Sequence, residues 1–383
     1  MNKKRVLVLS LSPLERDPRV MRQIHFLKDE CDLTVCGWGV SPSPEVEYIC
    51  ADDYRPGFLG KAFLLTMLAL HIDYAFYWGF RRHRETLRRL DKLQCDIVVS
   101  NDLDALPISL KIARRCNARL IADLHEYFPG QSSGWMFSLL FAGHNLRMCK
   151  WLLPKVDICM TVCKGIADLY KEQTGVSVSV LTNAPEYENL VPSAVNPNHV
   201  RLVHHGVASP ERKILELIEM MRGLEERFTL DLVLVADNDS AYMKQVTKSI
   251  SGSGGRVRLL PPFSMQEIAK RVNEYDLGIC MLETKALSKQ FALPNKFFEW
   301  IQGRLGIVTW PLPEMKRLIE LHKLGVVSSD FSIDSMQHAI NSLTVEDIVL
   351  FKKNACSAAG LFNAEANRDL FRGYVFSDAA TVK

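Results

Sequence analysis

The sequence predicts an α/β protein made of two Rossmann-like, doubly wound parallel-sheet domains that face each other across a cleft. Short apolar strands alternate with helical patterns along almost the whole chain, which is typical of parallel sheets covered by helices. The chain has 383 residues, which is too long for one ordinary domain and suits two. Residues 188–199 contain prolines and asparagines without periodicity and predict a linker. We expect domains at 1–190 and 191–355, and a helical tail at 356–383 that crosses back to the first domain.

The expected elements follow from apolar runs and helical periodicity. In the first half, strands are expected at 6–9, 33–36, 97–100, 120–123, 158–162 and 178–181, and helices at 19–28, 61–93, 106–116 and 165–174. In the second half, strands are expected at 201–204, 230–235, 257–260, 277–282 and 306–308, and helices at 213–226, 241–251, 265–272, 296–302 and 313–320. Two tail helices are expected near 345–360 and 363–374.

Bulk composition excludes several classes of protein. The net charge of +3 argues against a dedicated nucleic-acid binder. The ten cysteines show no metal-ligand spacing, and the first residues run straight into a strand without a signal-peptide core. Neither half has a G-x-G-x-x-G turn after its first strand, so a dinucleotide-binding dehydrogenase is disfavoured. We expect a cytoplasmic protein with reduced thiols, most of them in the core.

The most informative segment is residues 293–299, LPNKFFE, between two apolar strands. Pro294 cannot lie inside a helix and Asn295 is a good N-cap, so a helix is expected to begin near Lys296. Its free N–H groups would then point to the carboxyl edge of the sheet, where anionic ligands bind. Glu299 lies one turn further, suited to accept hydrogen bonds from sugar hydroxyls. The alternative is a capped core helix with one exposed glutamate.

The second half opens with a strand that ends in His205-Gly206, followed by Arg212 and Lys213 at an expected helix start. A glycine turn with adjacent cations suits a diphosphate, and the two cations would neutralise a leaving nucleoside diphosphate in place of a metal ion. The alternative is a solvated helix start with two surface cations, although cations are disfavoured at that end of a helix.

Polar residues also follow the strands of the first half. His125 comes directly after the strand at 120–123, at a carboxyl end that faces the expected cleft, although a lone histidine is more often structural. Asp102 and Asp104 form an Asp-x-Asp pair after the preceding strand. We expect them to cap the next helix or to line the cleft rather than to bind a metal ion.

The stretch from Phe58 to Arg89 combines apolar residues, aromatic residues and a cluster of arginines. Its longest uncharged run falls short of the roughly 20 residues that a membrane-spanning helix needs. This composition suits a helix that lies on an anionic membrane surface, with residues 135–140 and 151–153 as a second contact. A long core helix of the first domain is the alternative.

The chain resembles the retaining glycosyltransferase family 4, which has the GT-B fold. The resemblance covers nearly the whole chain and depends on the order of its motifs. These are 17–20 (DPRV), 101–107 (NDLDALP), 123–126 (DLHE), 183–185 (NAP), His205-Gly206 with Arg212, and 293–299 (LPNKFFE).

The resemblance implies a nucleoside-diphosphate-sugar donor held mainly by the second domain, an acceptor held by the first, and neither metal nor other cofactor. It implies that Glu299 binds the ribose, that Arg212 and Lys213 hold the diphosphate, and that His125 contacts the donor sugar. Gly206, Asn295 and Lys296 complete the donor side. The expected acceptor-side residues are Arg16, Asp17, Arg19, Asp102 and Glu126.

Two departures from the family pattern are present. Many members have a glutamate eight positions before the one matched by Glu299, but this chain has Phe291, with Glu283, Lys289 or Gln290 as possible substitutes. The usual glycine pair of the first loop is replaced by Ser10 and Ser12.

The expected function is retaining, metal-independent transfer of a sugar, such as that of a UDP-sugar, to a lipid-linked saccharide or polysaccharide of the cell envelope. The expected location is the inner face of the plasma membrane, to which the protein would bind peripherally. The alternatives are a nucleotide-sugar epimerase and an inactive subunit that supports a partner transferase.

Overall fold

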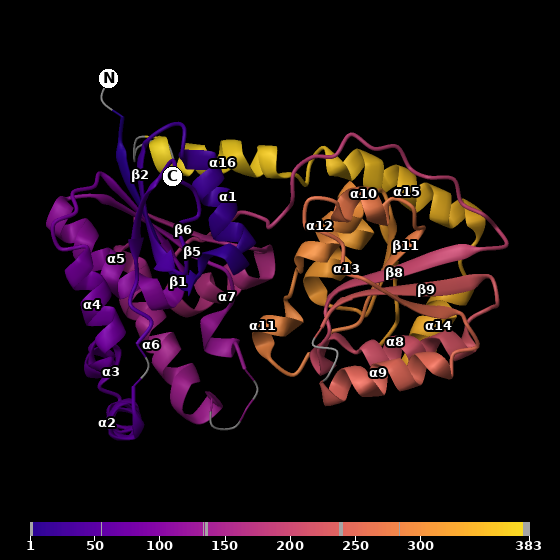
Figure 1. The fold of residues 1–383 in the computed structure, drawn as a ribbon, viewed down its shortest axis with the longest axis horizontal. Helices are drawn as coiled ribbons and strands as arrows, with labels where there is room; N and C mark the ends of the chain where they lie inside the picture. Colours follow the sequence, from indigo (N-terminus) through magenta and orange to yellow (C-terminus); the bar gives the residue numbers. More distant parts are fainter. Residues whose placement is uncertain are drawn as a thin grey trace. The chain divides into compact units, whose positions relative to one another are not determined.

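The computed structural model describes residues 3–54, 56–132, 134, 137–236, 240–282 and 284–377, with the side chains of Arg16 and Phe137 outside the described part. The chain forms two compact units, and Figure 1 shows its ribbon coloured along the sequence. Unit 1 contains residues 1–182 and 367–383, and unit 2 contains residues 183–366. The boundaries thus fall at 182 and 366, whereas we expected 190 and 355. Helix α15 (Val345–Ala359) stays in unit 2 because it packs on α12 (Asn295–Gln302) of that unit.

Unit 1 is built on a seven-stranded parallel sheet of order β3-β2-β1-β4-β5-β6-β7. Its strands are β1 (Arg5–Pro13), β2 (Asp32–Trp38), β3 (Glu47–Cys50), β4 (Ile97–Asn101), β5 (Arg119–Leu124), β6 (Ile158–Thr161) and β7 (Ser179–Val180). Its helices are α1 (Pro18–Leu27), α2 (Phe58–Ala69), α3 (Asp73–Gly79), α4 (Arg81–Arg89), α5 (Asp102–Cys116), α6 (Gly143–Leu152) and α7 (Lys164–Thr174), with most of α16 (Ala364–Phe376).

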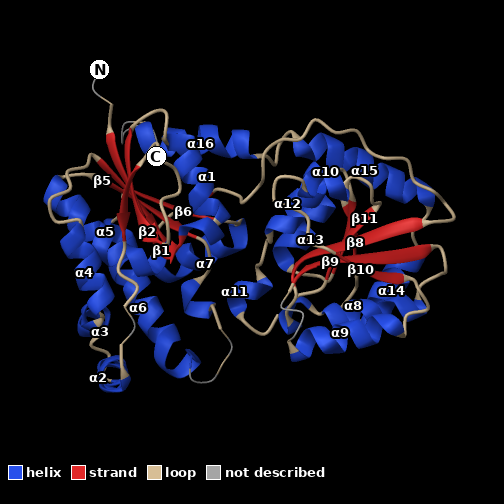
Figure 2. Cartoon of the chain, in the orientation of Figure 1, coloured by secondary structure: helices blue, strands red, loops and turns tan. Residues whose placement is uncertain are grey.

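Unit 2 is built on a six-stranded parallel sheet of order β10-β9-β8-β11-β12-β13, and Figure 2 shows its strands alternating with helices. The strands are β8 (Val200–Val207), β9 (Phe228–Val235), β10 (Val257–Leu260), β11 (Leu277–Cys280), β12 (Gly306–Thr309) and β13 (Gly325–Val327). Besides α12 and α15, the helices are α8 (Ile214–Met220), α9 (Ala241–Ser251), α10 (Ile268–Val272), α11 (Leu287–Gln290), α13 (Pro313–His322) and α14 (Ile333–Asn341).

The central strands of both sheets are buried along most of their length because helices cover both faces. Each sheet also has one point where the strand order reverses. The chain leaves β1 toward β2 and β3 but returns beside β1 as β4, and it does the same at β8 and β11. Such a switch point leaves an open crevice at the carboxyl ends of the strands, which is where ligands bind in open α/β sheets.

The main difference from the expected elements lies in residues 61–93, where one long helix was expected. The structure has three helices, α2, α3 and α4, because the chain turns at His71, which has a left-handed φ of 57°, and again at Phe80, which is extended. Strands β3 and β13 and helices α6, α11 and α14 were also missed. β3 is a half-exposed edge strand without a continuous apolar run, and β13 and α11 have only three and four residues.

Helices α2 and α3 form a small hydrophobic core of their own in unit 1, at the bottom of that unit in Figure 1. Leu64, Leu68 and Phe76 are its buried members, and Phe141 packs against them from the short π-helix Phe137–Ala142. Much of the outer surface of α2 is apolar and exposed. No helix within the described residues is both long and apolar enough to cross a bilayer.

Candidate functional site

In unit 2, the carboxyl end of β8 lies at the switch point and carries His204, His205 and Gly206. His204 is fully buried, and its Nδ1 lies 2.9 Å from the carbonyl oxygen of Ile279 on the neighbouring strand β11. Burial, together with the charge of Lys296, holds the pKa of His204 well below its usual value. His204 is therefore neutral, with Nδ1 donating to the carbonyl and Nε2 free to accept.

Lys296 lies in the first turn of α12 and is only 5% exposed. Its Nζ is 3.1 Å from His204 Nε2, and no carboxylate of the described residues lies within ion-pair distance of it. Burial, together with the charge of Arg212, lowers the pKa of Lys296 to about 8. A buried ammonium without a counter-ion is costly, so the geometry favours an anion from outside the chain.

The backbone of Gly206 lies next to the side chain of Lys296. Its φ is 123°, which side chains rarely adopt, and a Cβ at this position would lie 3.5 Å from Lys296 Nζ. The backbone of the β8 turn therefore approaches the ammonium closely. A ligand phosphate at this edge would meet both the lysine and the turn.

Arg212 and Lys213 follow β8, but the structure gives them different surroundings. Arg212 ends a short 3-10 turn, and its guanidinium has no ion-pair or hydrogen-bond partner among the described residues. Lys213 adopts a left-handed φ of 53° before α8, and its Nζ lies 2.9 Å from Glu216. Lys213 is therefore paired within the chain, whereas Arg212 acts electrostatically on Lys296, which was also expected on the donor side.

Glu299 points to the same strand end from the second turn of α12. Its Oε2 accepts a hydrogen bond from His205 Nε2 at 2.7 Å, so Nδ1 of the neutral ring carries a lone pair that is buried without a partner among the described residues. The second carboxylate oxygen can still accept from a ligand hydroxyl. Sequence reasoning assigned no role to His204 or His205, although a His-His-Gly run at a strand end at a switch point is a readable signal.

Asn295 does not cap α12 as expected. The helix begins at Asn295 itself, Pro294 occupies the cap position without a side-chain hydrogen bond, and the Asn295 side chain instead accepts a hydrogen bond from Asn183. The N–H groups of the first turn therefore lack a side-chain cap.

The residues considered as substitutes for the glutamate absent at Phe291 do not share one role. Lys289 forms an ion pair with Glu211 at 2.6 Å, and Gln290 donates to the carbonyl of Thr284. Glu283 lies outside the described residues.

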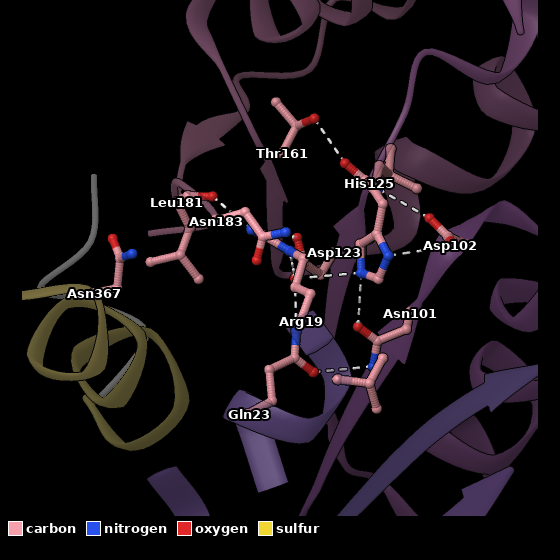
Figure 3. A network of polar contacts seen from close by, with 12 residues as sticks. Arg19, Gln23, Asn101, Asp102, Asp123, His125, Thr161, Leu181, Asn183 and Asn367 are labelled. Atoms are coloured by element: carbon pink, nitrogen blue, oxygen red, sulfur yellow. Dashed lines mark hydrogen bonds and ion pairs between the residues drawn. The ribbon is translucent and has the colours of Figure 1, made fainter. Parts of the chain in front are cut away.

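In unit 1, a buried polar network lies at the corresponding sheet edge (Figure 3). Arg19 on α1 makes two 2.7 Å contacts with the carboxylate of Asp123 at the end of β5, and a third with the carbonyl of Leu181. Gln23 also donates to Asp123, and Asn101 donates to Gln23. Arg19, expected on the acceptor side, is thus fully occupied inside the protein. Gln23, Asn101 and Asp123 were not expected as site residues, because only the tertiary structure brings α1, β4 and β5 together.

His125 and Asp102 form the outer part of this network. His125 is 16% exposed at its side chain, and its Nε2 lies 3.1 Å from the amide oxygen of Asn101. Asp102 accepts from the backbone N–H of His125 at 2.9 Å. Burial raises the pKa of Asp102 to about 6, although 29% of its side chain is exposed. Asp102 does not cap α5 as a side chain, because Asn101 is the cap residue and Asp102 has a left-handed φ of 65°.

The other expected acceptor-side residues are more scattered. Asp17 caps α1 by accepting from the N–H of Val20 and also accepts from the hydroxyl of Ser12. Glu126 is exposed, and the Arg16 side chain lies outside the described part. No cluster of three or more metal-ligating side chains suited to a metal ion occurs in the described ranges.

The chain was compared with known proteins. No protein-family model matches it, and no curated protein sequence matches it. Solved structures do match over almost the full length. Anabaena HepE, solved with UDP and glucose, is 15% identical with a TM-score of 0.67 and covers 97% of this chain and 99% of its own.

Two further structures show the same likeness. A trehalose-phosphate synthase (UDP-forming) from Burkholderia vietnamiensis is 11% identical, with a TM-score of 0.68 and coverage of 99% of both chains. Sucrose-phosphate synthase from Thermosynechococcus elongatus is also 11% identical, with a TM-score of 0.72 and coverage of 97% of this chain and 99% of its own. At these identities the likeness establishes the fold, and the predicted pair of Rossmann-like parallel sheets of the GT-B type is confirmed.

Proposed function

We propose that the protein is a retaining, metal-independent glycosyltransferase that uses a nucleoside-diphosphate sugar. Unit 2 would bind the donor. Arg212 and Lys296 would neutralise the diphosphate, Glu299 would accept hydrogen bonds from the ribose, and the turn at Gly206 would allow the phosphates to approach the backbone. Stabilisation of the departing diphosphate is the main catalytic contribution that these residues offer.

The observation that carries this proposal is the unpaired cation at the β8–β11 switch point. Lys296 is buried beside the neutral His204 without a carboxylate within ion-pair distance among the described residues, and Glu299 is already bound to His205. Proteins of similar fold have been solved with UDP and glucose, which supports UDP as the nucleotide. His125 in unit 1 would contact the sugar, and Asp17, Asp102 and Glu126 would face the acceptor.

The proposed acceptor is a lipid-linked saccharide or polysaccharide at the inner face of the plasma membrane. Exposed apolar side chains on α2 support a membrane contact, with Phe58 and Leu59 85% and 82% exposed. The arginines of α4 contribute less than the sequence suggests. Arg84 donates to the carbonyl of Trp78, and Arg89 contacts Asp52. Sedimentation with anionic liposomes at low salt tests this contact, and a protein that stays in the supernatant would remove it.

The deciding experiment measures the melting temperature of the pure protein with UDP, GDP, ADP or CDP in the presence of EDTA. A ligand at 100 times its dissociation constant stabilises the folded state by about 2.7 kcal/mol, which is a readily visible shift. We expect UDP to give the largest shift without metal. No shift with any of the four nucleotides would contradict the proposal.

One specific feature, Phe291 at the position of the expected first glutamate, favours an inactive supporting subunit as the second candidate. Turnover of a UDP-sugar by the purified chain would exclude it. Incubation with the donor alone also tests for an epimerase, which would yield an isomeric nucleotide sugar without any acceptor.

A further inference from the structure

Unit 1 contains a cavity whose lining residues do not include those of the polar network around His125. It has a volume of about 790 Å³, within the roughly 300–1,000 Å³ range of small-molecule sites. One wall is apolar and is formed by Leu64 and Leu65 of α2, Phe76 of α3, Phe80 and Phe141. Except for Leu65, these residues belong to the small core of α2 and α3, so this part of the lining depends on the break between the two helices.

The lining also contains four charged side chains. Lys61 and Arg82 provide two cations, and Glu15 and Asp53 provide two carboxylates. The Arg82 guanidinium lies 5.6 Å from the ring centre of Trp38 and 5.0 Å from that of Phe80, which fixes its position. Lys61 is exposed and has no ion-pair partner among the described residues. The lining therefore combines apolar side chains with two cations, which can hold a phosphate, and two carboxylates, which can accept hydrogen bonds from hydroxyls.

The position of the cavity connects it to the acceptor side of unit 1. Its residues Pro13 and Glu15 lie on the segment between β1 and α1 that also carries Asp17. Trp38 and Gly39 lie at the carboxyl end of β2, so the cavity opens at the same sheet edge as the polar network. The exposed apolar residues Phe58, Leu59 and Phe63 lie on the same helix as Lys61 and Leu65.

We propose that this cavity binds the lipid part of the acceptor, namely one hydrocarbon chain bearing a phosphate. The chain lies against the wall of Leu64, Leu65 and Phe141, and Lys61 and Arg82 hold the phosphate. Glu15 and Asp53 accept hydrogen bonds from the hydroxyls of the attached saccharide. This assignment rests on the proposed function and deepens it, because it places the lipid beside the loop that carries Asp17. A purely polar acceptor would leave the apolar wall without a partner.

The test is calorimetric titration of the full chain with decyl and dodecyl phosphate, each below its micelle concentration. We expect saturable binding of one molecule per chain. Two added methylene groups should tighten binding roughly tenfold, because each buried methylene contributes a constant increment. Inorganic phosphate should not compete at the same concentrations. Equal affinity for the two chain lengths, or equally strong competition by inorganic phosphate, would overturn the proposal.

Matched variants locate the binding site. Leu65→Glu places a charge in the cavity at a position that is 46% exposed and therefore tolerant, and it should weaken dodecyl phosphate binding at least tenfold. Leu59→Glu makes the same change on α2 outside the cavity and should leave the affinity within about twofold. Equal losses would show that the ligand coats the outer surface and would overturn the proposal. Lys61→Gln should weaken dodecyl phosphate but leave dodecyl maltoside, which lacks a phosphate, unaffected.

Parallel measurements separate this proposal from the proposed function. Each variant is first shown to melt as the wild type does, and its response to UDP is measured in the same preparation. A UDP response without alkyl phosphate binding would remove the lipid site and leave the donor site standing. Binding of alkyl phosphate that is sensitive to Leu65→Glu, without any nucleotide response, would support the lipid site and count against the proposed donor.

Discussion

Both units have buried charged residues at the carboxyl ends of their strands, but the two units differ in whether these charges are paired. In unit 1, the buried cation Arg19 is neutralised by Asp123, which also accepts a hydrogen bond from Gln23. In unit 2, the buried cation Lys296 has only the neutral His204 as a hydrogen-bond partner, and Arg212 has no partner among the described residues. The chain completes the charge balance of the first edge by itself and leaves that of the second edge open.

This difference separates a structural charge from a ligand-binding charge. A buried ion pair with satisfied hydrogen bonds is stable without a ligand, and its loss affects folding. A buried cation without a counter-ion raises the free energy of the empty protein, and binding of an anion removes this cost. The comparison therefore predicts that removal of the paired cation at the first edge lowers stability and that removal of an unpaired cation at the second edge weakens nucleotide binding.

The largest effect is expected for Arg19→Met in unit 1. The substitution leaves Asp123 buried without its cation and should lower the free energy of unfolding by about 3–5 kcal/mol. Chemical denaturation measures this loss. The double variant Arg19→Met with Asp123→Leu removes both charges and should recover much of it. A single variant as stable as the wild type would show that the ion pair does not hold α1 on the sheet.

The next largest effect is expected for Arg212→Ala in unit 2. It removes a charge that stabilises the departing diphosphate and should lower the transfer rate by about 10²-fold or more without changing the melting temperature. Lys213→Ala is the matched control and should cost much less, because Lys213 is already paired with Glu216. Steady-state transfer rates with a UDP-sugar measure both effects. A larger loss for Lys213→Ala would show that Lys213, rather than Arg212, is the main cation that stabilises the departing diphosphate.

Glu299→Ala should affect both binding and stability. We expect nucleotide affinity to fall about tenfold, as for the loss of a hydrogen bond to a charged group. The substitution also leaves His205 Nε2 without its acceptor, which should cost about 1–3 kcal/mol of stability. Glu299→Gln keeps an acceptor oxygen and should retain the stability. Titration calorimetry and thermal melting together check this, and unchanged affinity for both variants would remove Glu299 from the site.

A further prediction concerns the pH dependence of nucleotide binding. The pKa of Lys296 is about 8 in the empty protein, and a bound diphosphate should raise it. Below about pH 8 the ammonium is already charged, so affinity is at its maximum. Above this pH binding must take up a proton, and affinity should fall by up to tenfold per pH unit. Titrations from pH 7 to 10 measure the fall, and Lys296→Met should abolish it. A wild-type affinity that stays flat would contradict the role of Lys296.

Folding shows the opposite sign for the same group. Because the folded-state pKa of Lys296 lies below its unfolded value of 10.5, the unfolded chain binds more protons between these two values. The contribution of Lys296 to stability therefore rises with pH across this window, while its contribution to nucleotide binding falls.

Much of the site could be predicted from the sequence, because its residues lie close to a proline or a glycine that marks the end of a strand or the start of a helix. Lys296 and Glu299 follow Pro294, and Arg212 follows the turn at Gly206, so each was expected at a carboxyl strand end. The sequence did not show which of these cations are paired within the protein and which remain available to a ligand. Lys213 is paired locally with Glu216, whereas the partner of Lys296 is His204, 92 positions away, which only the tertiary structure reveals.

The sequence by itself determined the two parallel sheets, since buried strands and intervening helices impose distinct apolar periodicities. It also determined which residues reach the sheet edges, since strand ends are local features. Only the tertiary structure decided which of those residues neutralise one another, as Arg19 and Asp123 do, and which remain open to a ligand, as Lys296 and Arg212 do. The physical reason is that burial and pairing depend on strand order, and strand order brings together residues that the sequence separates.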